Sequence, residues 1–196
     1  MPRPRRICLP DHTYHVTSLC IRKAFLIKQD FWKEILLGVI DRTLKKYDFE
    51  LISYQIMDNH FHFIIKTTQN GPTISRIMQY IKARFAEIYN KKMNTTGPFW
   101  NERFKDKIIE HSDNPQMYFN WLMWYLAFNP VRNKTVSDPR DYKYGCINCY
   151  LYEDYPAQVK ITLHKYFLNL GDTFKERLKN FLSYEEAYRK RLALAI

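Results

Sequence analysis

A short segment with alternating polar and apolar residues limits most strongly how this chain can fold. In the run 54–66, Asp58-Asn59 separates two apolar stretches, which is typical of the turn of a β-hairpin. In the second stretch, the two-residue period of a strand places the apolar residues on one face and both His60 and His62 on the other. The sequence therefore predicts a hairpin that presents two imidazoles side by side.

Two interpretations of this histidine pair are open from the pattern alone. Neutral imidazoles that point the same way can supply half of a divalent-metal site. Alternatively, His60 and His62 are polar positions on the solvated face of an amphipathic strand. A motif of this kind is a hypothesis until its structural context is known.

Hydrophobic periodicity predicts the remaining elements. We expect a first strand over residues 12–27, followed by a helix that starts near Phe31 and is capped by Asp30. The further elements are strands over 49–57 and 61–67, a long helix from 74 to a break at 94–98, a strand over 104–109 and a helix over 116–128. This order predicts an α+β fold in which helices cover one antiparallel sheet.

The chain is expected to divide into four parts. Residues 1–10 form a basic N-terminal arm, 11–135 the main domain, 136–155 an irregular connecting segment, and 156–196 a helical C-terminal extension. Two roles are open for this extension, namely additional grip on nucleic acid and a dimer contact.

The charge balance points to a polyanionic partner. The 196 residues include 31 Lys and Arg against 20 Asp and Glu, a formal net charge of +11. A hydrophobic content of 46% is enough for a packed core, which argues against global disorder. With 16% aromatic residues, the chain can fill that core and still offer rings on which single-stranded nucleic acid could stack.

The sequence gives no sign of a membrane or secreted protein. No apolar stretch reaches the length of a membrane span, and the first residues lack the apolar region of a signal peptide. We therefore expect a cytoplasmic protein with reduced cysteines and no membrane partner. Cys146 and Cys149 have zinc-knuckle spacing, but no second close pair follows them, so metal binding there is left open.

A further feature lies at the end of the helix predicted over 116–128. Tyr125 and Asn129 are four residues apart, so an intact helix would carry them on one face, one turn apart. A tyrosine can act as a nucleophile, and an amide oxygen can bind a hard metal ion. A core tyrosine and a helix-ending asparagine are the alternatives. Pro130 is expected to bias Asn129 away from helical geometry.

Three segments together resemble the single-tyrosine HUH transposases, and most closely the REP-associated tyrosine transposases. The segments are Met57-Asp58-Asn59-His60-Phe61-His62, then Trp100 to Phe104, then Tyr125 with Asn129-Pro130-Val131. They occur in the family's order with compatible spacing, and the resemblance covers about residues 10–145. It implies an HUH or RRM-like α/β sandwich, with residues 11–135 as the catalytic domain.

The resemblance also implies a role for individual residues. His60 and His62 match ligands of a divalent cation, Mg²⁺ or Mn²⁺, and Asn129 matches the residue that completes the site. Tyr125 matches the nucleophile; Tyr118 is its nearest rival, but its spacing to the Asn-Pro-Val triplet does not fit the family. The implied function is metal-dependent cleavage and rejoining of single-stranded, hairpin-forming DNA through a 5′-phosphotyrosine intermediate.

Basic side chains are candidates for contacts with this DNA. They are Arg3, Arg5, Arg6, Arg76, Lys82, Arg84, Lys91, Lys92, Arg103, Lys105 and Lys107. Two other functions fit the same fold, namely a domesticated, non-catalytic nucleic-acid-binding protein and a nickase of the replication-initiator or relaxase type. Family members act as monomers and as homodimers, so either state is expected.

Overall fold

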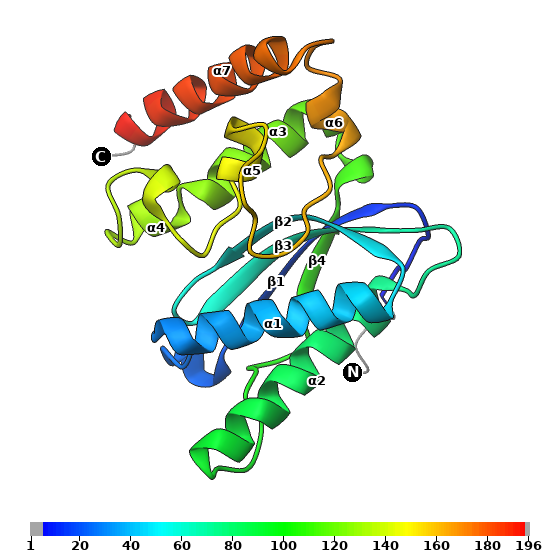
Figure 1. Cartoon of the computed structure of the whole chain (residues 1–196), viewed down its shortest axis with the longest axis vertical. Coiled ribbons are helices and arrows are strands. Elements are labelled where there is room, and N and C mark those ends of the chain that lie inside the picture. The colour runs from blue at the N-terminus through cyan, green and yellow to red at the C-terminus, as the bar shows by residue number, and fades with distance from the viewer. Residues whose placement is uncertain (1–5, 195–196) are drawn as a thin grey trace.

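A four-stranded antiparallel sheet lies between two helical layers in the computed structural model, which describes residues 6–194 (Figure 1). Its strands are β1 (Thr13–Leu19), β2 (Phe49–Ile56), β3 (His60–Thr67) and β4 (Lys105–Ile108). They lie side by side in the order β2-β3-β1-β4, and each neighbouring pair is antiparallel. The predicted α+β class, an antiparallel sheet covered by helices, is confirmed.

The helices cover both faces of the sheet (Figure 1). One layer holds α1 (Asp30–Lys46) and α2 (Ile74–Met93), and the other is built on α3 (Pro115–Ala127) and α7 (Phe174–Ala193). The short helices are α4 (Asn129–Arg132), α5 (Asn148–Leu151), α6 (Lys165–Leu168) and 3₁₀ turns at Ile21–Lys23, Ile109–His111 and Pro139–Asp141. Within residues 6–194, no helix is long and apolar enough to span a bilayer.

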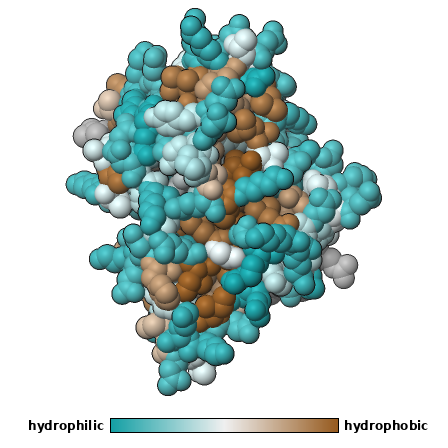
Figure 2. All heavy atoms as spheres, viewed as in Figure 1, coloured by the Kyte–Doolittle hydropathy of each residue, from teal (hydrophilic) through white to brown (hydrophobic). Residues whose placement is uncertain are grey.

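Strand β3 is buried on both faces. Its Phe61 and Phe63 belong to the core beneath α1 and α2, whereas Ile64 belongs to a second core beneath α3 and α7. Figure 2 shows hydrophobic residues gathered along the middle of one side of the molecule, with hydrophilic residues around them. The face that carries the histidines is therefore covered in part by the second helical layer: His62 is only 9% exposed, whereas His60 is half-buried.

Two of the predicted boundaries are wrong. The first strand ends at Leu19, well before residue 27, because Arg22 and Lys23 adopt left-handed backbone conformations with φ of 54° and 57°. Asp30 is the first residue of α1 and not its cap. The N-cap is Gln29, whose side chain makes no capping hydrogen bond.

The C-terminal part of the chain is built into the second layer. Its extended stretch runs beside β2, where the backbone N–H of Thr162 donates to the carbonyl of Leu51 at 2.9 Å. Helix α7 then packs on α3, and Phe181 stacks on Trp124 with ring centroids 5.0 Å apart. Of the segment 156–196, only α6 and α7 are helical among the described residues.

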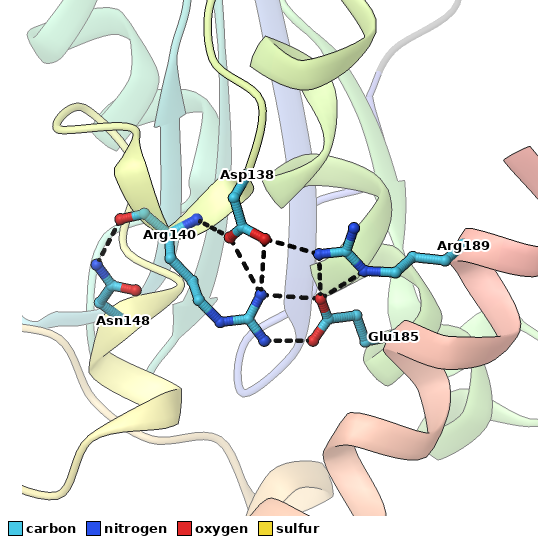
Figure 3. A network of polar contacts seen from close by, with 5 residues as sticks. All are labelled: Asp138, Arg140, Asn148, Glu185 and Arg189. Atoms are coloured by element: carbon cyan, nitrogen blue, oxygen red, sulfur yellow. Dashed lines mark hydrogen bonds and ion pairs between the residues drawn. The ribbon is translucent and has the colours of Figure 1, made fainter.

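A network of ion pairs fastens α7 to the loop that follows α4 (Figure 3). Buried Glu185 accepts from Arg140 Nη1 at 2.9 Å and from Arg140 Nη2 at 2.5 Å. Arg189 Nη2 donates to Glu185 at 2.7 Å and to Asp138 at 2.8 Å. Asn148 donates to the carbonyl of Arg140 at 2.9 Å, which joins α5 to the same network.

Removal of the buried carboxylate should weaken the fold. In Glu185→Ala, Arg140 and Arg189 lose a shared partner, and we expect the free energy of unfolding to fall by about 3 kcal/mol. Urea denaturation followed by circular dichroism measures this change. Glu186→Ala is the matched control, because Glu186 is exposed and has no recorded partner within residues 6–194. Equal losses in both variants would contradict the assignment.

A buried histidine joins the sheet to the second layer. His164 Nδ1 accepts from the backbone N–H of Tyr166 at 3.2 Å, so its Nε2 carries the proton and donates to Thr13 Oγ1 at 3.0 Å. Its ring stacks on Phe119 at a centroid distance of 4.7 Å. Burial lowers the pKa of His164 to about 3.

This histidine should make the fold sensitive to acid. Below pH 6.5, His164 becomes protonated in the unfolded chain but stays neutral in the folded protein. The free energy of unfolding therefore falls as the pH drops toward 3. Between pH 7 and pH 4 we expect His164 alone to cost about 3 kcal/mol. His164→Gln should lose correspondingly less over this range in denaturation measured at each pH. If the free energy of unfolding fell equally with pH in wild type and His164→Gln, His164 would not be the source of the acid sensitivity.

Candidate active site

The turn before β3 is held by neighbouring elements. The Asp58 carboxylate pairs with the buried Lys33 ammonium of α1 at 2.7 Å. The carbonyl of Asn59 accepts from the backbone N–H of Cys20 at 2.8 Å, and its side chain donates to the carbonyl of Lys23 at 3.1 Å. These bonds set the position at which β3 begins, and with it the position of His60.

The pairing of β1 with β3 brings a third imidazole to the site. Thr17 lies opposite His62 and His15 lies opposite Ile64, and directly opposite residues point to the same face of a sheet. His15 Nε2 is 3.0 Å from His62 Nδ1, and the two rings stack with centroids 5.2 Å apart. His15 therefore supports His62 from the neighbouring strand.

His60 and His62 each keep one ring nitrogen free. His60 Nδ1 donates to Asn59 Oδ1 at 2.7 Å, and His62 Nδ1 is engaged by His15. No hydrogen bond within residues 6–194 uses Nε2 of either ring, and the two ring centroids are 5.1 Å apart. In metal sites, a second group commonly holds the ring nitrogen that does not bind the ion.

Burial favours the neutral form of all three imidazoles. It lowers the pKa of His62 well below 6.5, and the neighbouring His15, His60 and Arg132 lower it further. Burial also lowers the pKa of His15 to about 4. The pKa of His60 is lowered by burial and by Arg132, although Asp58 opposes this shift. Neutral imidazole is the form that binds metal ions.

Helix α3 places Tyr125 over this group. The centroids of the Tyr125 and His62 rings are 6.5 Å apart, in an edge-to-face arrangement, and Tyr125 is 40% exposed. The Arg132 guanidinium lies 4.4 Å from the Tyr125 ring centroid, and its Nη1 donates to the Tyr125 carbonyl at 3.1 Å. The same Nη1 donates to the hydroxyl of Tyr188 on α7. Helix α7 thus supports the arginine that orients Tyr125.

Asn129 follows a one-residue break in the helix. Phe128 (φ −80°, ψ 0°) separates α3 from α4, and Asn129 is the first residue of α4. The expectation that Pro130 removes Asn129 from helical geometry is therefore wrong, because a proline in the first turn lacks only an N–H that needs no helical acceptor. Asn129 is 8% exposed, and its Nδ2 has no hydrogen-bond partner. Nδ2 is a hydrogen-bond donor, so a metal ion would have to bind Asn129 through the amide oxygen Oδ1 and not through this atom.

The donor set is compatible with a cation that takes few protein ligands. His60 and His62 each offer an unengaged Nε2, and Asn129 could offer the oxygen of its side-chain amide. Over residues 6–194, no group of three or more His, Cys, Asp or Glu side chains is arranged so that it could hold a metal ion. Water and substrate oxygens would supply the remaining ligands, as is common for Mg²⁺.

The candidate DNA-contacting residues divide between the two faces of the sheet. On β4, Lys105 lies opposite Thr17 and Lys107 lies opposite His15, so both lysines share the histidine face. Lys107 also lies 3.9 Å from the ring of Tyr118 on α3, so Tyr118 packs against a cation. The candidates on α2 lie on the other side of the sheet: Arg76, Lys82, Arg84, Lys91 and Lys92.

The N-terminal candidates are only partly described. Arg6 pairs with Asp106 and lies 3.5 Å from the Phe104 ring centroid, next to the exposed Arg103. Arg3 and Arg5 lie outside the described residues, as does half of the predicted arm. Arg6 therefore contributes to packing at the β4 edge.

Cys146 lies in the loop beside β2, and Cys149 lies in α5. Cys146 Sγ donates to Ser53 Oγ at 3.2 Å and accepts from the backbone N–H of Tyr54 at 3.2 Å. The four cysteines, all within the described residues, are unpaired. The contacts of Cys146 thus fasten the connecting segment to the sheet.

Sequence reasoning missed His15, Arg132 and Tyr188 as parts of this site. His15 lies in the predicted first strand, whose two-residue period indicates only weakly which face it occupies. The register between β1 and β3 is needed to show that His15 meets His62. Arg132 directly follows the Asn-Pro-Val triplet, so its place in the motif was available. Nothing in the sequence signals that Tyr188 would reach Arg132.

Comparisons with known proteins agree with this geometry. Residues 8–119, more than half of the chain, match the family model described as "Transposase IS200 like"; the match ends before Tyr125. A Haemophilus influenzae protein provisionally described as a REP-associated tyrosine transposase is 20% identical over 113 residues, which is 53% of this chain. The match spans 62% of that relative, less than two thirds of its length.

A solved structure shows the same fold. It is described as a REP-associated tyrosine transposase bound to a REP hairpin, with a TM-score of 0.62 and 18% sequence identity. The likeness covers 84% of this chain and 94% of that one. It therefore extends beyond residues 8–119, the part of the chain that matches the family model.

Loss of the Arg132 charge should be visible in the nearby imidazoles. In Arg132→Leu we expect the pKa of His60 to rise, because a positive charge that disfavours protonation is removed. An NMR titration of the imidazole protons measures this shift. Lys134→Asn is the control: it removes an equal charge two residues away, at a position with φ of 57° that asparagine tolerates. An unchanged His60 titration in Arg132→Leu would argue against this effect of the Arg132 charge on His60.

Proposed function

Because the chain belongs to the family of IS200-like transposases, we propose that it cleaves and rejoins single-stranded DNA with Tyr125 as the nucleophile. The observation that carries the proposal is the position of Tyr125. Its accessible ring lies against His62 and beneath the Arg132 guanidinium, on the face of the sheet that holds the neutral histidines.

The proposed reaction is an exchange of phosphodiester partners. Tyr125 Oη forms a bond to the scissile phosphorus while the bond from phosphorus to the 3′ oxygen breaks, and the tyrosine proton is lost as the leaving oxygen gains one. The products are a 5′-phosphotyrosyl enzyme and a free 3′-hydroxyl. Attack by another 3′-hydroxyl reverses these steps and joins two strands, so no external energy source is needed.

The residues around Tyr125 prepare this attack. A divalent cation, Mg²⁺ or Mn²⁺, held by His60, His62 and Asn129 would withdraw negative charge from the scissile phosphate. His15 holds the His62 ring by its Nδ1 and so directs Nε2 into the site. Arg132 orients the tyrosine ring and adds positive charge where the phosphate must approach.

We further propose that the substrate is single-stranded DNA that folds into hairpins. The net charge of +11 suits a polyanion, and Lys105 and Lys107 extend the positive surface beside the site. The structural neighbour is described as bound to a REP hairpin, which suggests the same class of DNA here. Both a monomer and a homodimer are compatible with this proposal.

Two alternative functions differ in their products. A domesticated binding protein would form no covalent adduct; the presence of both histidines, Tyr125 and Asn129 argues against such decay. A nickase of the replication-initiator type would form the same adduct but would not rejoin strands. A strand-transfer assay with a second labelled oligonucleotide separates these outcomes.

The covalent intermediate provides the direct test. Incubation of labelled hairpin DNA that has single-stranded flanks with the protein and Mn²⁺ should give a denaturation-resistant protein–DNA species. Tyr125→Phe should abolish this species, because the phenyl ring has no oxygen to bond to phosphorus. His60→Ala and His62→Ala should reduce the adduct at least 100-fold, since the proposed transition-state stabilisation is lost. All three variants should retain salt-sensitive DNA binding.

Tyr152→Phe is the matched control for the tyrosine, because Tyr152 is 52% exposed, directly follows α5 and stacks on Tyr155 and not on a residue of the site. It should form the adduct at the wild-type level. An adduct that persists in Tyr125→Phe would show that Tyr125 is not the nucleophile. Tyr118 would then be the next residue to substitute.

A further inference from the structure

Three aromatic side chains follow one face of α3 toward the candidate active site. Tyr118, Trp121 and Tyr125 stand at positions i, i+3 and i+7, which lie within one narrow arc of a helix. Tyr118 and Trp121 are partly exposed, and Tyr125 is 40% exposed. We call these three residues the α3 aromatic stripe. Its length from Tyr118 to Tyr125 is about 10 Å at 1.5 Å per residue.

Each ring of the α3 aromatic stripe has a cation beside it, and the cations come from three different elements. Lys107 of β4 lies 3.9 Å from the Tyr118 ring centroid. Arg191 of α7 lies 5.6 Å from the Trp121 ring centroid. Arg132 of α4 lies 4.4 Å from the Tyr125 ring centroid.

A pocket of about 610 Å³ opens at the end of the stripe that is distant from Tyr125. Lys107 and Arg191 lie on its walls, together with Tyr118 and Trp121. Among the described residues, Asp113 is the single carboxylate that lines it, against the two basic side chains of Lys107 and Arg191. The pocket is therefore both aromatic and positively charged.

We infer that the α3 aromatic stripe and this pocket bind the single-stranded flank of the DNA next to the scissile phosphate. The inference rests on the function proposed above and adds the path of the DNA strand across the protein surface. Bases stack on Tyr118 and Trp121, while Lys107 and Arg191 contact the phosphates. Rings combined with cations suit unpaired bases, whose faces are free to stack, whereas bases inside a duplex already stack on one another.

This placement gives the C-terminal helix a role in substrate binding. Arg191 belongs to the basic run Arg189-Lys190-Arg191, but these three residues differ in their surroundings. Arg189 is bound to Glu185 and Asp138, whereas Lys190 is exposed and has no recorded partner within residues 6–194. Arg191 is the one that lines the pocket.

Binding of two DNA molecules in the presence of EDTA tests the inference without cleavage. One is a hairpin with single-stranded flanks, and the other is the same hairpin with no flank. Arg191→Ala and Tyr118→Ala should each weaken binding of the flanked hairpin at least fivefold and leave binding of the flankless hairpin unchanged. In Arg191→Ala the salt dependence should also decrease by about 0.7 in slope, the value for one phosphate contact to a single strand.

Lys190→Ala is the matched control, since it removes the same charge from the neighbouring position and should change neither affinity. Equal weakening by Lys190→Ala and Arg191→Ala would overturn the inference, as would equal losses for the two DNA molecules. Because no adduct is measured, failure of this test leaves the Tyr125 mechanism intact, and failure of the adduct test does not alter these affinities.

Photocrosslinking gives a second readout that does not depend on how well a variant folds. Wild-type protein is irradiated with flanked DNA that carries 5-iodouracil in the flank, and the crosslinked peptides are identified by mass spectrometry. Crosslinks in residues 115–127 of α3 support the inference. Crosslinks confined to α2, on the other side of the sheet, would overturn it.

Discussion

The strand β3 is covered on both faces, and the arrangement of the site depends on this constraint. Successive side chains enter different layers, so Phe61 and Phe63 fill the core under α1 and α2 while His62 enters the layer under α3. If the pairing of β1 with β3 slipped by one residue, the phenylalanines would move to the histidine face and His62 to the phenylalanine face. The Lys33–Asp58 ion pair and the backbone bond from Cys20 to Asn59 hold the turn at which the register begins.

The candidate site of this member of the IS200-like transposase family is assembled from separate parts of the chain. Strand β3 supplies two imidazoles, β1 supplies the His15 that supports one of them, and α3 supplies Tyr125. Arg132 then connects Tyr125 to α7 through the Tyr188 hydroxyl. The helical layer on that face thus has two effects: it buries most of the His62 imidazole and it places Arg132 against the ring of Tyr125.

Much of this arrangement could be predicted from local sequence patterns. The two-residue period placed His60 and His62 on one face, and the order of strands and helices predicted the α+β class. Contacts between distant segments could not be predicted in this way. The contact of His15 depends on strand register, and the position of the α2 cations depends on which face of the sheet that helix covers. Local periodicity contains neither kind of information.

The contact between Arg132 and Tyr188 has a consequence for genes of this kind. A premature stop codon after the codon for residue 173 would preserve the histidine pair, the tyrosine and the Asn-Pro-Val triplet in the product. It would remove α7, uncover Trp124 and release Arg132 from its hydroxyl partner. Such a truncated reading frame would still match every local signature of the family, yet its tyrosine would lack support. An intact set of motifs is therefore insufficient to identify an intact enzyme in a genome.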